Sequence, residues 1–195
     1  MKFRSERLVF REVMQDDFKL LYSLFSNTQV MKYAYIDKYN SEEEMLPYFN
    51  KILQNNVTPF EDRKAFEFAV FSASEGSFVG FADVEIHNIN DSGGCGEIGY
   101  FLLPEFWGRG YAGEIANALT EISFKHLRLH KLSARCNSNN TASEKVMKKA
   151  GMTKEGELRK VRFKNGCWDS EKVYGILKDE WKLKPVGCIR DFSME

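Results

Sequence analysis

The chain has 195 residues, which allows one domain with a sizeable core and is short for two. Its 28 basic and 28 acidic side chains cancel, so neither nucleic acid nor a membrane surface is expected as the main partner. Hydrophobic residues make up 43% of the chain, which indicates a packed globular protein and excludes a disordered one.

The first third of the chain predicts one strand, two helices and an intervening loop. Residues 4–12 alternate well enough for a strand, and residues 16–25 place apolar side chains at helical spacing behind two aspartates that can cap a helix. Residues 27–40 read as an aromatic-rich loop. Ser41 and Glu44 have the spacing of a capping box, so a second helix should begin there.

The rest of the chain is richer in strands. Four segments have the pattern of strands or hairpins: residues 65–72, 77–88, 131–136 and 158–177, the last turning about Asn165-Gly166. Residues 139–150 predict a helix closed by Gly151. Residues 185–195 show no clear pattern and are taken as a tail behind a single mixed α/β (α+β) domain, residues 1–184.

The most informative stretch is Glu97 to Gly113, EIGYFLLPEFWGRGYAG. An apolar strand is followed by a break at Pro104, a turn with three glycines, and a helix expected over residues 114–127. Glycines let the backbone approach a ligand closely, and the free N–H groups in the first turn of a helix attract anions. This order of elements predicts a cradle for a diphosphate.

Two common diphosphate motifs fit this stretch poorly. Residues 108–113 match GxGxxG, but residues 104–107 separate the glycines from the strand, and the next strand is not followed by the acidic residue that binds a ribose in dinucleotide folds. The hairpin-rich chain also lacks the strand–helix alternation of those folds. The P-loop is excluded because no Gly-Lys-Ser/Thr follows the glycines.

The same stretch resembles the acetyl-CoA signature of the GNAT N-acetyltransferases. Gly110 and Ala112 take the two small positions, whereas Trp107 stands where the general pattern has Gln or Arg. WGxGYA is typical of the branch that contains the ribosomal-protein N-terminal (alanine/serine) acetyltransferases. The block from Asn140 to Met152 and the closing EG…R…D…EW residues are similar to the same branch. The resemblance covers about residues 4–181.

The resemblance implies a single-domain GNAT fold: a mixed, mostly antiparallel, twisted sheet flanked by helices, with a splayed pair of central strands. It also implies acetyl-CoA as cosubstrate. The residues that it assigns to coenzyme A are, for the pantetheine arm, Phe101, Leu102, Leu103 and Asn140, and for the pyrophosphate, Arg109, Gly110, Tyr111, Ala112 and Gly113. Asn140 can equally be a helix cap.

Acetyl transfer to an amine requires a base for the ammonium proton and an acid for the leaving thiolate. Glu97 is the preferred base, at the start of the strand beside the cosubstrate; Glu85 and Asp83 are weaker alternatives. Many GNAT enzymes use a tyrosine as the acid, but Met147 occupies that position here. Ser143 is the remaining candidate for a hydrogen bond to the thiol.

The acceptor is expected to be a primary amine, with a protein N-terminus suggested first and polyamines, aminoglycosides or amino-acid-like metabolites left open. Tyr33, Tyr35 and Phe49 could wall its site, although ordinary core packing is the preferred explanation at such spacing. The alternative class is a binding module that senses acetyl-CoA without turnover, which the missing tyrosine would favour. Monomer and homodimer both remain open.

No metal site is predicted, because His126 and His130 have the spacing of two ligands but no third. The charged opening MKFRSERLVF does not have the apolar core of a secretory signal. Cys95, Cys136, Cys167 and Cys188 form no CxxC pair. A cytoplasmic protein with reduced thiols is therefore expected.

Overall fold

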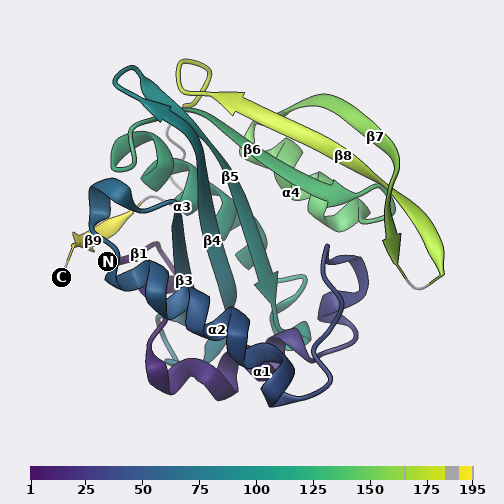
Figure 1. Ribbon diagram of the computed structural model, residues 1–195. Helices are drawn as coiled ribbons and strands as arrows, with labels where there is room; N and C mark the ends of the chain where they lie inside the picture. The colour runs from purple at the N-terminus through teal and green to yellow at the C-terminus, as the bar shows by residue number, and fades with distance from the viewer. Residues whose placement is uncertain (165, 183–188, 195) are drawn as a thin grey trace.

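The computed structural model describes residues 1–164, 166–182 and 189–194. These residues form a nine-stranded sheet in the order β7-β8-β6-β5-β4-β3-β2-β1-β9 (Figure 1). The strands are β1 (Lys2–Arg4), β2 (Leu8–Glu12), β3 (Ala65–Ser72), β4 (Phe78–Asn90), β5 (Gly93–Leu102), β6 (Leu129–Asn137), β7 (Thr153–Lys164), β8 (Cys167–Leu177) and β9 (Arg190–Ser193). The α-helices are α1 (Phe18–Phe25), α2 (Glu42–Val57), α3 (Tyr111–Lys125) and α4 (Thr141–Ala150). Short 3-10 turns lie at Gln15–Asp17, Val30–Tyr33, Phe60–Asp62 and Pro104–Phe106.

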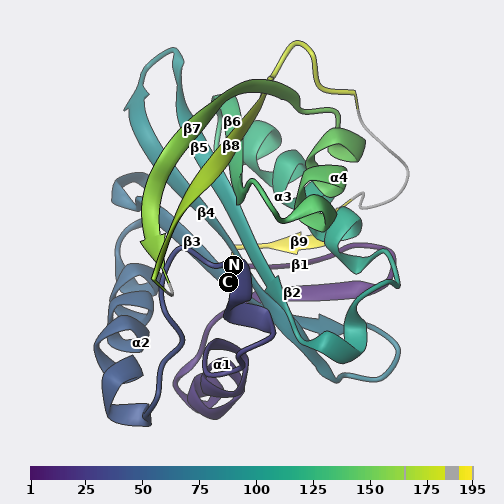
Figure 2. The ribbon, with the colours of Figure 1, turned by 90° about the vertical axis from the view of Figure 1, so that its right-hand side faces the viewer.

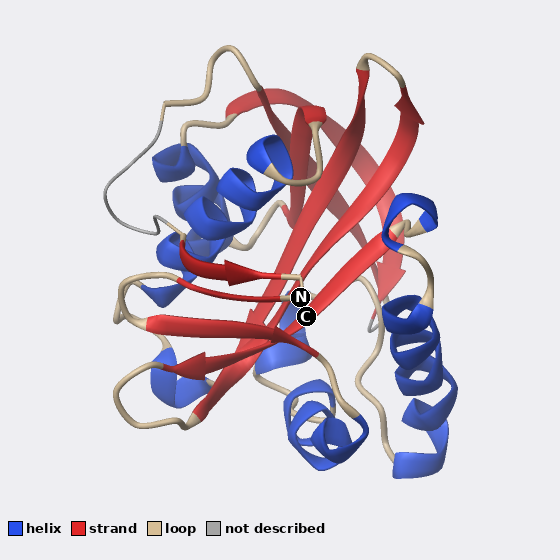
Figure 3. Ribbon diagram, turned by 90° about the vertical axis from the view of Figure 1, so that its left-hand side faces the viewer, coloured by secondary structure: helices blue, strands red, loops and turns tan. Residues whose placement is uncertain are grey.

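The helices cover the two faces of the sheet in pairs. Helices α1 and α2 lie on one face, and α3 and α4 lie on the other (Figures 1 and 3). Each face has its own buried cluster: Leu24, Phe49 and Phe81 belong to the α1–α2 side, and Val84 and Leu119 to the α3 side. The side chains of every central strand therefore alternate between two cores.

Local signals explain where the helices begin and end. The Ser41 side chain accepts a hydrogen bond from the Glu44 N–H at 3.3 Å, so the predicted cap of α2 is confirmed. The Asn140 side chain accepts from the Ser143 N–H at 3.1 Å and caps α4 in the same way. Gly151 closes α4 with φ of 93°, a left-handed conformation that glycine adopts without steric cost.

The first predicted strand is wrong in one respect: it is two strands. Residues 5–7 turn the chain between β1 and β2, which pair antiparallel, and the Ser5 N–H donates to the Leu8 carbonyl at 2.9 Å across the turn. Alternation alone did not reveal this turn because its residues, Ser-Glu-Arg, are as polar as an exposed strand face.

Residues 88–96, which lie between the expected strand 77–88 and the stretch that begins at Glu97, are mostly strand. Strand β4 continues to Asn90 and β5 begins at Gly93, so Glu97 lies in the middle of β5 rather than at its start. A Cβ on Gly96 would lie 2.6 Å from the Leu129 side chain and 2.9 Å from the Glu85 carbonyl oxygen. The glycine is there because neighbouring strands crowd it, which the sequence alone does not distinguish from turn chemistry.

The ends of the sheet also differ from the prediction. Arg190–Ser193, within the segment taken as a tail, is edge strand β9 and pairs with β1. The predicted turn residue Asn165 and the boundary at 184/185 lie outside the described residues, whereas the flanking strands β7 and β8 are confirmed. Among the residues that the structure describes, no helix is long and apolar enough to cross a membrane.

One strand pair organises the site. Strands β5 and β6 run parallel and pair from Gly94 opposite Leu129 to Glu97 opposite Ser133. Beyond Glu97, residues 98–102 of β5 pair with β4 alone, while β6 pairs onward with β8. We call the point where the two strands part the fork.

Candidate active site

The glycine turn ends in an exposed helix start. Gly108 and Gly110 have φ of 73° and 81°, and Gly110 is the N-cap of α3. The Glu114 N–H is the first to bond within the helix, to the Gly110 carbonyl at 3.2 Å. The N–H groups of residues 111–113 have no acceptor among the described residues, so they are available to a bound anion.

A buried ion pair holds this helix start in place. Glu114, which is fully buried in the first turn of α3, accepts hydrogen bonds from the Ser5 hydroxyl at 2.6 Å and the Arg7 Nε at 2.7 Å. Arg7 also donates to the Arg109 carbonyl at 2.9 Å and lies 4.6 Å from the centre of the Tyr111 ring. The turn between β1 and β2 therefore fixes the backbone of the cradle.

Trp107, the departure from the general GNAT pattern, has a structural role. Its indole N–H donates to the Leu102 carbonyl at 2.8 Å and ties the end of β5 to the glycine turn. The Leu103 N–H donates to the Val79 carbonyl at 3.0 Å, towards β4. Because backbone groups of alternate residues point to opposite sides of a strand, Phe101 and Leu103 face β4, whereas Tyr100 and Leu102 face the fork.

Two hydroxyl groups meet on the α3–α4 face of the fork. The Tyr100 hydroxyl, from β5, lies 3.4 Å from the Ser143 hydroxyl in the first turn of α4. Burial raises the pKa of Tyr100, and its contact with Ser143 opposes this shift. Met147, at the position of the usual acid, is 2% exposed and packs in the core. The structure therefore pairs the predicted Ser143 with a tyrosine that the sequence did not single out.

The opposite face carries four carboxylates, which we call the acidic row: Glu67 of β3, Asp83 and Glu85 of β4, and Glu97 of β5. Glu67 stands directly across from Asp83, and Glu85 across from Glu97, in the strand registers. Asp83 lies over Gly99, where a Cβ would come within 2.5 Å of the Asp83 Oδ1. The shared face predicted for Asp83, Glu85 and His87 is confirmed.

The acidic row is poorly neutralised. Arg135 forms an ion pair with Glu97, Nε to Oε2 at 2.9 Å. Glu67, Asp83 and Glu85 have no ion-pair partner within the part of the chain that the structure describes. Such a concentration of negative charge attracts a cation.

Burial and mutual repulsion change how these acids titrate. Burial, followed by the charges of Glu85, Glu67 and Glu97, raises the pKa of Asp83 to about 8. Burial also raises the pKa of Glu67, to about 7, although the hydrogen bond from Asn55 opposes it. Burial raises the pKa of Glu97, and the positive charge of Arg135 acts against that rise. Raised carboxyl pKa values are typical of acid–base sites.

Two tyrosines cover the acidic row. Tyr35 follows the 3-10 turn at Val30–Tyr33, and Tyr48 lies on α2; burial and the nearby carboxylates raise the pKa of both. The Tyr35 hydroxyl is buried and has no partner among the described residues. Phe49 is fully buried in the α1–α2 core, so of the predicted wall residues Tyr35 is the one near Glu97.

The β7–β8 hairpin reaches the loop between α1 and α2 (Figure 2), and its side chains hold Tyr35 in position. The Lys164 ammonium donates to the carbonyls of Met31, Ala34 and Ile36, at 2.8, 2.9 and 2.6 Å. The Arg162 guanidinium lies 4.4 Å from the centre of the Tyr35 ring. The end of the sheet thus reaches back to the loop beside α2.

The remaining predicted residues lie apart from this site or have local roles. His126, one of the two histidines at ligand spacing, stacks on Phe192 at 3.9 Å between ring centres. Among the described residues, no three His, Cys, Asp or Glu side chains are grouped as metal ligands. Cys95, Cys136 and Cys167 are free thiols, and Cys188 lies outside the described residues.

Sequence reasoning missed Glu67, Tyr48, Tyr100, Arg135 and Lys164. Their strands and helices were largely predicted, so the missing information was which strands are neighbours. Strand alternation on residues 65–72 could have placed Glu67 on one face, but without the β3–β4 register nothing linked it to Asp83.

Comparison with known proteins identifies the family. Residues 7–153 match the acetyltransferase (GNAT) domain model. The chain is 32% identical to YnaD, an N-acetyltransferase of Bacillus subtilis whose function is uncharacterized, over 93% of this chain and 99% of that protein. It is 29% identical to YdaF of the same organism, a putative ribosomal N-acetyltransferase, over 55% of this chain and 58% of that protein.

A solved structure supports the same assignment. Spermidine N-acetyltransferase from Vibrio cholerae, in complex with CoA and spermine, is similar with a TM-score of 0.76 and 25% identity, over 89% of this chain and 96% of that one. The predicted GNAT fold, with its splayed central strands, is confirmed, and the ribosomal branch has partial support from YdaF. The chain belongs to the GNAT family of acetyltransferases.

Proposed function

We propose that this protein transfers an acetyl group from acetyl-CoA to a primary amine by direct attack at the fork. The observation that carries the proposal is that the anion cradle and the acidic row approach the fork from different sides. The free N–H groups at the start of α3 suit a pyrophosphate, and the acidic row suits an ammonium group. The Vibrio relative is solved with CoA and spermine, which supports the combination of a CoA donor with an amine acceptor.

The donor side uses backbone groups of this chain. The N–H groups of residues 109–113 bind the pyrophosphate, and the backbone of Tyr100 and Leu102 faces the pantetheine arm. Phe101 and Leu103 offer the arm no backbone partner, since their N–H and C=O groups are directed at β4. Asn140 supports the arm by fixing the start of α4.

Glu97 is the proposed base. It is the last residue of β5 paired to β6 before the fork, and it is partly buried with 20% of its side chain exposed. Its carboxylate accepts the ammonium proton, directly or through water, and the free amine attacks the thioester carbonyl. The C–N bond forms and the C–S bond breaks, and the second ammonium proton, which the nitrogen loses as the amide forms, passes to the leaving thiolate. The Ser143 hydroxyl, which the Tyr100 hydroxyl adjoins, stabilises that thiolate by donating a hydrogen bond.

The acetyl-CoA thioester supplies the activated carbonyl. The chain supplies position, a proton acceptor on one face of the sheet and a hydrogen-bond donor to the thiolate on the other. This division explains how Met147 can replace the usual tyrosine, because the donor-face hydroxyls come from Ser143 and Tyr100 instead.

The test measures thiol release from acetyl-CoA with a panel of alkylamines, polyamines, aminoglycosides and N-terminal peptides. Mass spectrometry identifies the acetylated products. We expect acetylated amine in proportion to thiol. Calorimetry with acetyl-CoA is measured in parallel. Binding without transfer to any amine would overturn the proposal in favour of the sensing module, and absence of binding would overturn both.

A further inference from the structure

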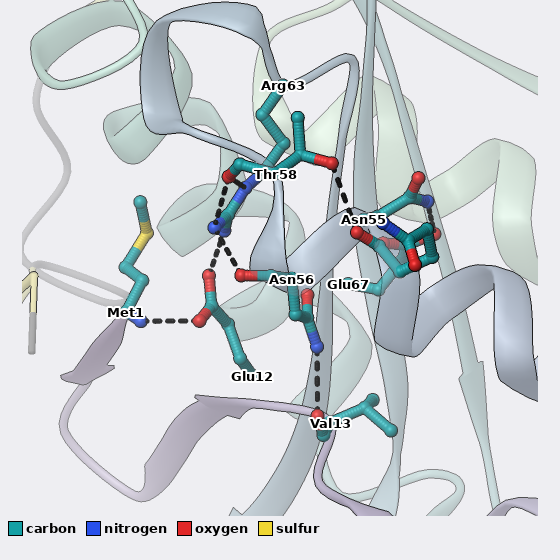
Figure 4. Close-up of polar contacts among 9 residues, drawn as sticks. Met1, Glu12, Val13, Asn55, Asn56, Thr58, Arg63 and Glu67 are labelled. Atoms are coloured by element: carbon teal, nitrogen blue, oxygen red, sulfur yellow. Dashed lines mark hydrogen bonds and ion pairs between the residues drawn. The ribbon is translucent and has the colours of Figure 1, made fainter.

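Glu67 forms the end of the acidic row away from Glu97, which we call the inner end, and one of its carboxylate oxygens is in an unusual environment. Glu67 is 6% exposed, and its Oε1 accepts a hydrogen bond from the Asn55 side chain of α2 at 2.9 Å (Figure 4). Its Oε2 is buried and has no partner in the described residues. A buried carboxylate oxygen without a partner is costly, so a native structure that keeps one calls for an explanation.

The neighbouring cations do not supply that partner. Arg63 is occupied by Glu12 and by the carbonyls of Asn56 and Thr58, as Figure 4 shows. Lys51 and Arg63 are near enough to lower the pKa of Glu67, but neither is within ion-pair distance of it in the described structure. Because Glu67 stands opposite Asp83 in the strand register, its side chain lies on the face of the sheet that carries the acidic row.

The acidic row is also longer than one ammonium group requires. Strand spacing puts the Cα atoms of Glu67 and Glu97 about 12 Å apart, two strands over and two residues along. Glu97, with Arg135, stands at the fork, while Asp83 lies between it and Glu67 in the register. A single ammonium at Glu97 would leave the Glu67 end without a cation.

We propose that the acceptor is a diamine whose reacting amine lies beside Glu97 and whose second ammonium group is bound by Glu67 at the inner end of the acidic row. The inference rests on the proposed function and narrows its acceptor to a small dication. Asp83 bridges the two ends and Tyr48 covers them. Burial is the main cause that raises the pKa of Glu67 and Asp83, and repulsion from Glu85 adds to both; a bound dication relieves that repulsion.

The test compares acceptors that differ in one group. Steady-state kcat/KM is measured for 1,3-diaminopropane, 1,4-diaminobutane and 1,6-diaminohexane, against n-butylamine and n-hexylamine, and for a neutral N-terminal tetrapeptide. We expect one of the diamines to exceed the monoamine of matched length by at least about tenfold, since the second ammonium gains a buried partner. Equal values, or a preference for the peptide, would overturn the inference while leaving the proposed acetyl transfer intact.

The Glu67→Gln variant tests whether Glu67 causes the preference for a diamine. The glutamine can still accept the Asn55 hydrogen bond, so the fold should persist, and a melting curve checks this. We expect the ratio of diamine to monoamine kcat/KM to fall by about tenfold or more. Glu61→Gln, an exposed acid on the turn at Phe60–Asp62, is the control that keeps the wild-type ratio. An unchanged ratio in Glu67→Gln would contradict the assignment.

Direct binding separates this inference from the proposed function. Calorimetry with 1,4-diaminobutane and with n-butylamine, in the presence of coenzyme A, needs no turnover. Tighter diamine binding that is lost in Glu67→Gln supports the site even if no amine is acetylated. No difference between the two ligands would overturn it whatever the transfer assay gives.

Discussion

The two sides of the fork are built by different means. The donor side is a local structure: β5, the glycine turn and α3 follow one another in the chain, and the cradle consists of backbone N–H groups. The acceptor side is assembled from β3, β4, β5, α2 and the β7–β8 hairpin, and its functional groups are all side chains. A backbone site depends on conformation, whereas a side-chain site depends on which elements become neighbours.

This difference teaches what can vary. A cradle made of backbone groups tolerates changes in side chains provided that the turn is kept, as Trp107 in place of the usual Gln or Arg illustrates. A row of carboxylates changes its charge with any single substitution. The same donor side can therefore be combined with many acceptors. Substitutions on the donor side should change the affinity for acetyl-CoA, and substitutions on the acceptor side should change the reaction with the amine.

Glu97→Gln should distinguish the two sides most clearly, because it should lower kcat/KM without changing the affinity for acetyl-CoA. Loss of the base should lower kcat/KM by about 10²- to 10³-fold, because general-base catalysis contributes on that order. The affinity for acetyl-CoA, measured by calorimetry, should stay within about twofold, since the cradle is untouched. Asp83→Asn is the comparison: if it lowers the rate more than Glu97→Gln does, Asp83 is the base.

Gly110→Val should give the reverse pattern. Gly110 has φ of 81°, where a β-branched residue is strained, so the N–H groups of the cradle should move and acetyl-CoA affinity fall by about tenfold or more. Gly76→Val is a matched control, because Gly76 has φ of 69° with open space around it in the β3–β4 turn. Equal loss of affinity in both variants would show that only stability had changed.

Removing the donor-face hydroxyl should be milder. Ser143→Ala is expected to lower kcat by about tenfold, with little change in either KM, because the hydroxyl acts on the leaving thiolate and Tyr100 remains beside it. The double variant Ser143→Ala/Tyr100→Phe should lower kcat by a larger factor than the product of the two single-variant factors. Full activity in the double variant would contradict a role of either hydroxyl in stabilising the leaving thiolate.

Lys164→Ala should weaken the acceptor side alone. The carbonyls of Met31, Ala34 and Ile36 would lose their hydrogen-bond donor, which should reduce local stability by about 1–3 kcal/mol. Tyr35 should then be held less firmly, and the KM for the amine should rise by roughly threefold to tenfold. Acetyl-CoA affinity is the internal control. Arg159→Ala, an exposed cation on the same strand, should leave both constants unchanged.

The smallest effect concerns pH. The native pKa of Asp83, about 8, is above its ordinary value of 3.8, so the native state retains a proton that the unfolded state releases. Stability should therefore decline as pH rises from about 4 to about 8. Asp83→Asn should flatten this decline, by a few degrees in Tm at the alkaline end. A wild-type Tm that rises across this range would contradict the burial of Asp83.

Much of the fold could be predicted from the sequence. Ser41, Asn140 and Gly151 carry local signals, and β3, α2 and α4 are where those signals put them. The glycine turn, also a local signal, led to the proposed donor side, which stays a prediction. The turn at Ser5–Arg7 and the crowded Gly96 were misread, because turn and strand use the same residue types there.

The acceptor side was largely out of reach. Glu67 and Lys164 are unremarkable in sequence, one a lone acid in an apolar strand and the other a basic residue before a turn. Their roles follow from strand order and from a hairpin that bends across the sheet. No periodicity contains that information.

The contacts of Lys164 also bear on how the molecule assembles. Its partner Met31 is 133 residues away along the chain, whereas the parts of the cradle are contiguous. Contacts that close long stretches of chain form late in folding, and locally held segments open before the core does. We therefore expect hydrogen exchange to be faster at residues 31–36 than in α3. A partly opened molecule would still bind its acyl donor while having lost the ability to choose an acceptor.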